Sequence, residues 1–191
     1  MNNRLLRTFI SIPVPNSVKN VKQMLTSTCE DEKVVIHWVK HNNLHITLHF
    51  LGFTPEKHIH QINKVLLNVT KSQKAFDLTI TNTGKFPDSI KPSVLYLAVD
   101  GNLKALHKLV NNINKEISSI GYDKDVKKYT PHVTVGKISY PQKFKPDLTT
   151  FLNSSYDKID FTVNKIQFMS SETLPDGVLY SSLNTFSFLE N

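Results

Sequence analysis

The sequence has few of the residues that build cross-links, and none of the long apolar runs that cross a membrane. It contains one cysteine, Cys29, so no intrachain disulfide can form and a cysteine-based metal site would lack its ligands. No run approaches the roughly 18 apolar residues of a membrane helix. Pro13 and Pro15 break the apolar start of the chain, and no signal-peptide cleavage pattern follows. We therefore expect a cytoplasmic protein with no membrane segment.

The composition also has no extreme that would indicate disorder. Of the 191 residues, 39% are hydrophobic and 20% are charged, as in ordinary soluble globular proteins. Lysine and arginine outnumber aspartate and glutamate by 23 to 16, which gives a formal net charge of +7. A basic surface attracts polyanions and makes nucleic acid a natural partner, but many lysine-rich proteins have no such partner. The charge alone leaves this choice open.

Hydrophobic periodicity predicts strands and helices mixed along the chain. Helices are expected at 16–28, 54–69 and 102–117. In the second, Thr54 is the expected cap and Pro55 lies in the first turn, and Gly121 ends the third. Strands are expected at 7–14, 33–39, 43–51, 76–84, 93–99, 131–138, 159–169 and 178–188. The runs 33–39 and 43–51 are predicted to pair with each other. Too many strands follow one another directly for a doubly wound parallel sheet, so we expect an α+β fold with mainly antiparallel sheets.

Two of the predicted strands carry the same short motif. LHITL at 44–48 and PHVTV at 131–135 both contain histidine, an apolar residue, threonine and another apolar residue. Successive side chains of a strand point to opposite faces, so His45 shares a face with Thr47, and His132 shares a face with Thr134. Each copy therefore presents one imidazole and one hydroxyl together.

Two such strands facing each other across a cleft suit displacement at phosphorus. One histidine can accept the proton of an attacking water while the other protonates the departing oxygen. Histidine has the pKa for both tasks near neutral pH, and threonine hydroxyls can donate hydrogen bonds to the phosphate oxygens.

Other interpretations compete with catalysis. A single His-x-Thr in a strand usually has a structural role. Only the second copy of the motif makes the catalytic interpretation as strong as the structural one. Strand alternation puts His49 on the same face as His45, so it could line the cleft. We favour the alternative that His49 lies near solvent at the end of the strand. A zinc site would collect His37, His41, His45, His49, His58 and His60, but their spacings fall on strands and a turn rather than on a metal-binding helix.

Five longer stretches strengthen the catalytic hypothesis. They are RTFISIPVP, HWVKHNNLHITLHFLG, GKFPDSIKPSVLYLAV, TPHVTVGKI and SSETLPDGVLYSSLNTFSF. With their motifs these stretches resemble the two-histidine (2H) phosphoesterase superfamily, and most closely its bacterial and archaeal RNA 2′,3′-cyclic phosphodiesterases, formerly called 2′-5′ RNA ligases.

The resemblance implies one bilobal α+β domain over residues 1–191, with two pseudo-symmetric lobes of mainly antiparallel sheet, flanking helices and an active-site groove between the lobes. It implies hydrolysis of RNA 2′,3′-cyclic phosphate ends to 2′-phosphates without a metal or other cofactor. His45 would be the proton donor to the 3′ oxygen and His132 the acceptor from water. Thr47 and Thr134 would hold the phosphate.

The chain departs from the family pattern at two positions, where many relatives have arginine in place of Lys137 and a basic or aromatic residue in place of Thr130. Lysine supplies charge without arginine's planar fork. Strand alternation also puts Lys137 on the opposite face from His132 unless the strand ends or bulges. Phe86 is the aromatic residue that the resemblance favours for stacking on a base, and packing at the base of a loop is an equal alternative.

Several residues are assigned to structure rather than to function. Trp38 and Tyr180 are expected to pack within the lobes, and Ser170 and Ser171 to cap a turn. RNA with cyclic-phosphate or 2′-5′ linked ends is the expected partner, and the protein is expected to be a monomer. The alternative functions are action on 2′-5′ linked oligonucleotides or on an ADP-ribose cyclic phosphate, and RNA binding without catalysis.

Overall fold

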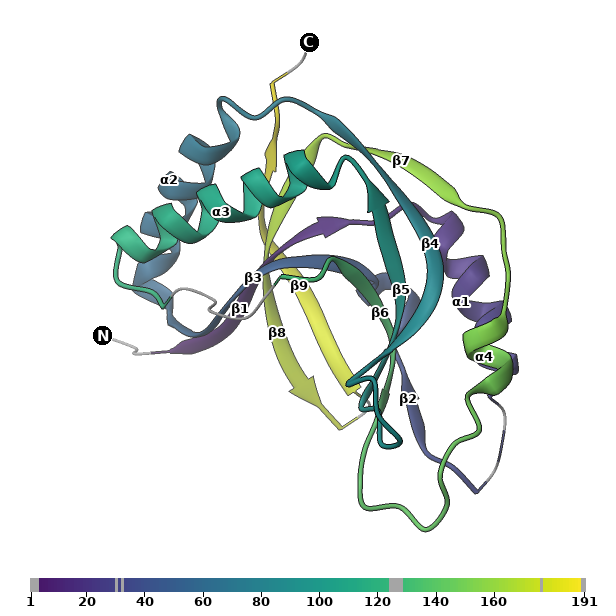
Figure 1. Cartoon of the computed structure of the whole chain (residues 1–191). Helices are drawn as coiled ribbons and strands as arrows, with labels where there is room; N and C mark the ends of the chain where they lie inside the picture. The colour runs from purple at the N-terminus through teal and green to yellow at the C-terminus, as the bar shows by residue number, and fades with distance from the viewer. Residues whose placement is uncertain (1–3, 30, 32, 124–128, 176, 190–191) are drawn as a thin grey trace.

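The computed structural model describes residues 4–29, 31, 33–123, 129–175 and 177–189. This part of the chain forms nine strands and four α-helices, and Figure 1 shows how they are arranged. The strands are β1 (Leu5–Pro13), β2 (Ile36–Trp38), β3 (His45–Pro55), β4 (Phe76–Phe86), β5 (Val94–Gly101), β6 (His132–Ile138), β7 (Ile159–Val163), β8 (Lys165–Leu174) and β9 (Gly177–Ser187). The helices are α1 (Ser17–Ser27), α2 (Ile59–Thr70), α3 (Leu103–Ser119) and α4 (Thr149–Asn153), with 3-10 turns at His41–Asn43 and Glu56–His58.

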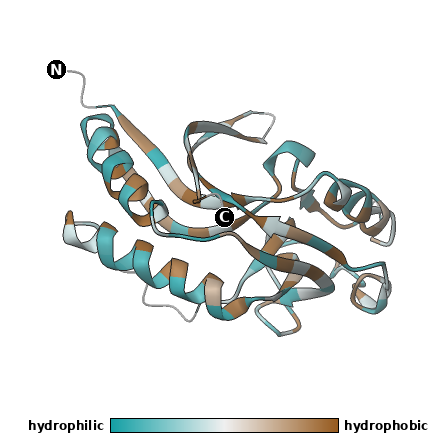
Figure 2. Ribbon diagram, turned by 90° about the horizontal axis from the view of Figure 1, so that it is seen from above, coloured by the Kyte–Doolittle hydropathy of each residue, from teal (hydrophilic) through white to brown (hydrophobic). Residues whose placement is uncertain are grey.

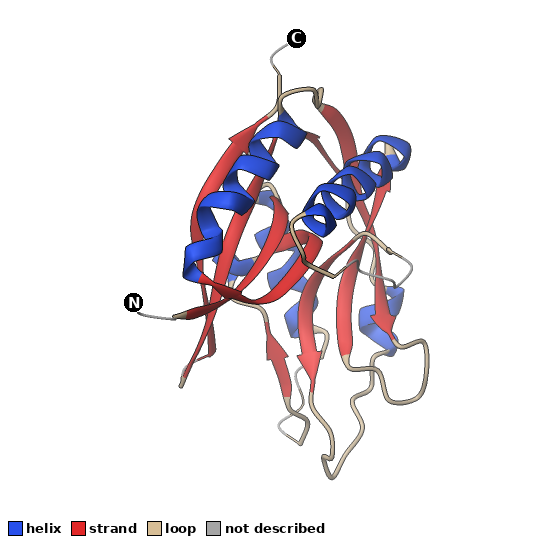
Figure 3. Ribbon diagram, turned by 90° about the vertical axis from the view of Figure 1, so that its left-hand side faces the viewer, coloured by secondary structure: helices blue, strands red, loops and turns tan. Residues whose placement is uncertain are grey.

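The sheet consists of two antiparallel halves that meet at the motif strands. One half has the order β9-β8-β1-β3 and the other β6-β5-β4-β7, while β2 adds to β6. The two halves join through a single pair of opposed residues, Ile46 of β3 and Val133 of β6. Figure 3 shows the strands of the two halves as curled layers. This arrangement confirms the predicted α+β fold with two similar lobes.

The helices pack on both halves. α2 and α3 lie side by side; α2 contacts β9 and α3 contacts β3, whereas α4 contacts β4 of the other half. The buried side of α3 carries Leu106, Val110 and Ile113 at helical spacing. Figure 2 shows the same alternation, with hydrophobic and hydrophilic stretches along each helix.

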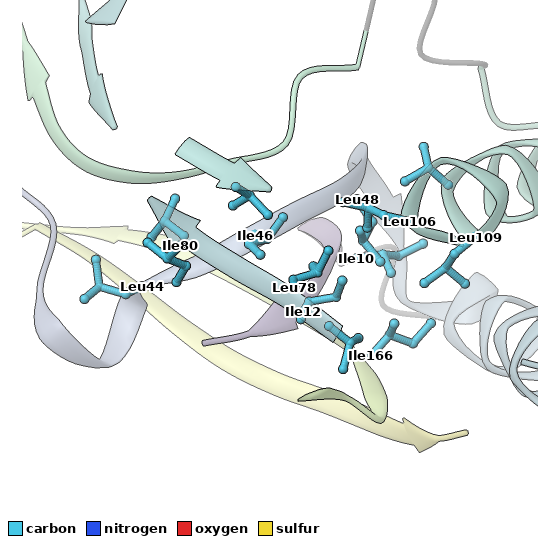
Figure 4. Close-up of a cluster of buried hydrophobic side chains, with 14 of the residues drawn as sticks. Ile10, Ile12, Leu44, Ile46, Leu48, Leu78, Ile80, Leu106, Leu109 and Ile166 are labelled. Atoms are coloured by element: carbon cyan, nitrogen blue, oxygen red, sulfur yellow. The ribbon is translucent and has the colours of Figure 1, made fainter. Parts of the chain in front are cut away.

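One hydrophobic core extends beneath both motif strands. Ile46 and Val133, the apolar residues inside the two motifs, are fully buried in it. In Figure 4, Leu106 of α3 lies beside Leu48 of β3, which extends the core toward the helices. A buried aliphatic side chain of this size contributes about 1.5–3 kcal/mol. The apolar positions of the motifs therefore anchor the strands that present the polar ones.

The helix expected from Thr54 begins later than predicted. β3 continues to Pro55, a 3-10 turn follows, and α2 starts at Ile59. Thr54 is buried, and its hydroxyl hydrogen-bonds that of Thr8 at 2.7 Å. A threonine before a proline resembles a helix cap in sequence, but pairing with β1 keeps this segment extended.

Two strand predictions also change. The run 33–39 forms only the short strand β2, and it pairs with β6 rather than with β3. The run 159–169 divides at Asn164 into β7, which pairs with β4, and β8, which pairs with β1. Both errors concern long-range pairing, which local periodicity does not encode. Among the described residues, no helix is long and apolar enough to cross a membrane.

Candidate active site

A β-bulge follows each His-x-Thr motif. In the pairing of β1 with β3, Ile10 lies opposite His49 and Ser11 opposite Thr47, so Leu48 is the extra residue. In the pairing of β5 with β6, the register shift leaves Val135 as the extra residue. A bulge reverses the alternation of side chains beyond it. The residue three places after each threonine therefore returns to the motif's face.

Phe50 and Lys137 occupy these two equivalent positions. Both line the same cavity as the motif residues, together with Arg7 of β1. The guanidinium carbon of Arg7 lies 5.0 Å from the centre of the Phe50 ring, a cation–π contact. Lys137, which simple alternation would turn away, thus reaches the candidate site.

The two histidines are oriented in the same way. The Nδ1 of His45 lies 2.7 Å from the carbonyl oxygen of Asn43, and the Nδ1 of His132 lies 2.7 Å from that of Thr130. A carbonyl only accepts, so each Nδ1 carries the hydrogen and Nε2 is the nitrogen that exchanges a proton. The Nε2 of His45 is 3.0 Å from the hydroxyl of Thr47.

Each imidazole also contacts a pair of aromatic rings that touch each other. The ring centre of His45 is 4.8 Å from that of Phe9 and 5.4 Å from that of Tyr180. His132 is 5.2 Å from Phe86 and 5.5 Å from Tyr96. These contacts restrict rotation of the two imidazoles.

Burial is the main influence on the titration of both histidines. It lowers the pKa of His45 and the pKa of His132 below the usual 6.5, because the charged imidazole is poorly solvated there. The carbonyl partners oppose this shift. The positive charges of His132 and Lys137 lower the pKa of His45 further. Both imidazoles are therefore mainly neutral at neutral pH.

A cavity of about 210 Å³ lies beside these groups. Its lining includes His45, Thr47 and Thr134, and His132 lies two residues before Thr134 on β6. The remaining lining residues are Arg7, Phe9, Val39, Asn43, Phe50, Lys137, Ser171, Thr173, Val178 and Tyr180. The cavity has the hydroxyls and cations that an anionic phosphate would need.

The second half of the chain also supports the first motif directly. The hydroxyl of the half-buried Tyr129 donates a hydrogen bond to the backbone carbonyl of Thr47 at 3.1 Å. Burial raises the pKa of Tyr129, so this phenol keeps its proton. Because Tyr129 lies three residues before His132, this contact links the strands of both motifs.

The structure corrects three assignments made from the sequence. His49 is 2% exposed rather than near solvent, and its Nδ1 lies 2.6 Å from Oδ1 of Asn114. The bulge turns His49 into the core together with Leu48. Tyr180 contacts His45 in the cavity instead of packing only within a lobe. Ser170 and Ser171 lie inside β8, not at a turn, and Ser171 lines the cavity.

Other assignments keep their sequence-based interpretation. Trp38 packs against the hydrophobic core. Phe86 stacks on Tyr96 at 4.2 Å and also contacts His132, so both of its suggested roles stay open. Arg7, Phe9 and Phe50 line the cavity and were not singled out from the sequence. Alignment of the two motifs could have found Phe50, because it stands where Lys137 stands.

The histidines do not gather into a metal-binding group. Within the described residues, no three side chains of histidine, cysteine, aspartate or glutamate are placed to hold a metal ion together. His58, one member of the suggested zinc set, instead bonds the hydroxyl of Tyr122 through Nδ1 at 3.0 Å.

Comparison with known families agrees with this geometry. A model of the 2′-5′ RNA ligase superfamily matches residues 14–174. The chain belongs to this superfamily. The resemblance predicted from the sequence is thereby confirmed, and with it the prediction that the chain is an enzyme.

Members of the superfamily are similar to the chain over nearly its whole length. An RNA 2′,3′-cyclic phosphodiesterase of Thermotoga maritima is 29% identical over 184 residues and covers 96% of each chain. The protein of the same name from Aquifex aeolicus is 28% identical over 192 residues, which is 96% of this chain and 97% of the relative.

Solved structures confirm the fold. TT0787 of Thermus thermophilus matches with a TM-score of 0.80 at 20% identity, over 96% of this chain and 98% of that one. Escherichia coli LigT in complex with 3′-AMP matches with a TM-score of 0.75 at 18% identity, over 98% and 100% of the two chains.

Proposed function

We propose that this member of the superfamily hydrolyses RNA 2′,3′-cyclic phosphate ends to 2′-phosphate ends by two-histidine acid–base catalysis, without a metal. The observation that carries the proposal is the matched pair of histidines, each with Nδ1 on a carbonyl and Nε2 available for proton transfer. The names of the Thermotoga and Aquifex relatives support the same substrate class.

The proposed reaction needs one acid and one base. The Nε2 of neutral His132 accepts a proton as a water oxygen attacks phosphorus. The bond from phosphorus to the 3′ oxygen breaks, and Nε2 of protonated His45 donates its proton to that oxygen. The phosphate then stays on the 2′ oxygen, so atoms and charge balance without a covalent intermediate.

Hydroxyls and cations hold the phosphate in this proposal. Thr47 and Thr134 donate hydrogen bonds to the non-bridging oxygens. Lys137 and Arg7 supply positive charge from the same cavity. Lys137 acts as a point charge, since lysine has no planar fork for two phosphate oxygens. Phe86 is retained as a candidate substrate contact, because its ring already touches His132.

The setting of the enzyme is part of the proposal. The net charge of +7 favours RNA as partner. We also propose that residues 1–191 form one bilobal domain, since a single hydrophobic core runs through both half-sheets. A monomer acting in the cytoplasm fits these features.

Two other functions compete. Cleavage of 2′-5′ linkages, or opening of an ADP-ribose cyclic phosphate, would use the same acid and base. A non-catalytic RNA-binding protein would need positive charge but no matched pair of titrating groups. The paired orientation of His45 and His132 therefore favours catalysis.

The deciding experiment offers three substrates side by side. An oligoribonucleotide with a 2′,3′-cyclic end, a 2′-5′ linked oligoadenylate and an ADP-ribose cyclic phosphate are incubated with the protein and EDTA, and the products are identified by mass spectrometry. We expect the cyclic-ended RNA to react fastest and to yield a 2′-phosphate. Faster turnover of either other substrate would reassign the enzyme, and turnover of none would support RNA binding alone.

A further inference from the structure

A second cavity also borders His45. It has a volume of about 200 Å³, and it shares Asn43, His45 and Tyr180 with the cavity described above. The second cavity is lined further by Ser11 of β1 and Gln167 of β8. The proposed reaction uses neither residue.

Ser11 is unusual among the residues of this second cavity. Its side chain is 1% exposed, and its hydroxyl makes no hydrogen bond within the described part of the chain. Ser11 and Gln167 lie directly opposite each other on β1 and β8, so their side chains are neighbours on one face. A buried hydroxyl without a partner destabilises the fold, and such groups are rare without a functional reason.

The proposed reaction places the terminal ribose near the second cavity. His45 protonates the leaving 3′ oxygen, which stays attached to that ribose, so the ribose must lie close to His45. Because His45 also lines the second cavity, this cavity lies next to the ribose and is open to its base.

The size and chemistry of the second cavity suit a nucleobase. Drug-sized ligands occupy about 300–1,000 Å³, so a cavity of about 200 Å³ has room for a planar ring system rather than a whole nucleotide. The hydroxyl of Ser11 and the amide of Gln167 each offer a donor and an acceptor, as a base edge requires. Pro13 and Met169 add apolar surface for the faces of the ring.

The rim of the second cavity is positively charged. Lys19 of α1 lies at this rim, with its Nζ 3.5 Å from Oδ1 of Asn42. An ammonium at this place would attract the phosphate on the 5′ side of the terminal nucleoside. Ser11 and Gln167 thus match the base of a terminal nucleotide, and Lys19 matches the next phosphate of an RNA 3′ end.

We propose that this second cavity binds the nucleobase of the terminal nucleotide, and that Ser11 and Gln167 hydrogen-bond its polar edge. The inference rests on the proposed function, because the place of the ribose near His45 follows from the role of His45 as proton donor. It assigns the terminal-base preference of the enzyme to residues outside the two motifs.

Equilibrium binding tests the proposal without relying on turnover. The four nucleoside 2′-monophosphates and inorganic phosphate are titrated into the wild type, Ser11→Ala and Gln167→Met. We expect at least one nucleotide to bind the wild type on the order of tenfold or more tightly than phosphate, and each substitution to remove most of that advantage. Affinity for inorganic phosphate should not change.

Matched controls separate ligand contacts from folding. Ser155→Ala and Gln61→Met change exposed residues of the same types and should bind like the wild type. Ser11→Ala should unfold no more easily than the wild type, because the Ser11 hydroxyl has no hydrogen-bond partner among the residues that the structure describes.

Two results would overturn the base site. One is equal affinity of all four nucleotides and phosphate, and the other is a base preference that survives both substitutions. Turnover of cyclic-ended RNA, measured separately on the wild type, distinguishes failure of the base site from failure of the proposed function.

Discussion

His45 and His132 show how far single residues could be predicted from the sequence. Their pairing was predictable, because two identical patterns in strand-like contexts favour two matching side chains. Their common tautomer was not, because it depends on the carbonyls of Asn43 and Thr130 two residues upstream. Arg7 was not predictable either, since it reaches the cavity from a strand without a motif.

The lowered histidine pKa values predict an acidic optimum. The kcat/KM of the free enzyme should rise as His132 loses its proton and fall as His45 loses its own. Burial lowers both pKa values below 6.5, so the bell-shaped profile should peak below pH 6.5. Measurement of kcat/KM against pH at constant ionic strength checks this. An optimum on the alkaline side of 6.5 would contradict the assignment.

Lys137 provides a second test at the residue scale. Lys137→Met should lower kcat/KM about tenfold, because it removes a cation that stabilises the charge on the phosphate. Lys137→Arg should retain most of the activity, since the charge remains. Lys64→Met, on the exposed side of α2, is the matched control. If Lys137→Met behaves like this control, the cation contributes nothing to the reaction.

At the scale of elements, the bulges of β3 and β6 complete the site. Each bulge turns the third residue after the threonine back toward the motif's face. The alternation of His45 with Thr47 could be predicted from a period of two. The bulge could not, because an extra residue is inserted only where two strands pair, and the sequence of one strand does not specify its partner. The same limitation explains the wrong partner assigned to β2.

A substitution at Gly84 of β4 tests whether the ring of Tyr96 holds His132 in position. A methyl group at this position would lie 2.7 Å from Cε2 of Tyr96, whose ring packs against His132. Gly84→Ala should therefore displace Tyr96 and lower kcat roughly 10- to 100-fold through misplacement of the base. Steady-state kinetics with the cyclic substrate measure the loss.

A double variant identifies the cause of that loss. If the methyl group acts by displacing the ring, Gly84→Ala combined with Tyr96→Leu should be no slower than Tyr96→Leu alone. Additive losses in kcat would mean that Gly84 acts independently of Tyr96, and this account of β4 would then be wrong.

At the scale of the whole molecule, the two halves of the sheet present the same chemistry twice. The order β9-β8-β1-β3 mirrors β7-β4-β5-β6, and Ile46 meets Val133 at the junction. This symmetry was expected from the resemblance to the 2H phosphoesterases. The match to the superfamily model confirms that the chain belongs to that family. One bilobal domain stays a prediction, supported by the continuous core.

The net charge of +7 predicts salt-sensitive RNA binding. The affinity of His132→Ala for a cyclic-ended oligoribonucleotide should fall at least several-fold between about 50 and 200 mM salt. Protein binding releases counterions from the RNA, and this release is less favourable when the salt concentration is higher. Fluorescence anisotropy measures it without substrate turnover. An affinity that does not change over this range would mean that the basic surface has no part in RNA binding.

The rate of opening of a 2′,3′-cyclic phosphate end by wild type, His45→Ala and His132→Ala, in the presence of EDTA, tests the central claim most directly. Each variant should be slower by on the order of 10²–10⁴, the usual contribution of a positioned acid or base. His60→Ala, an exposed histidine of α2, should retain full activity. A near-normal rate in either motif variant, or activity that EDTA abolishes and a divalent cation restores, would contradict two-histidine catalysis.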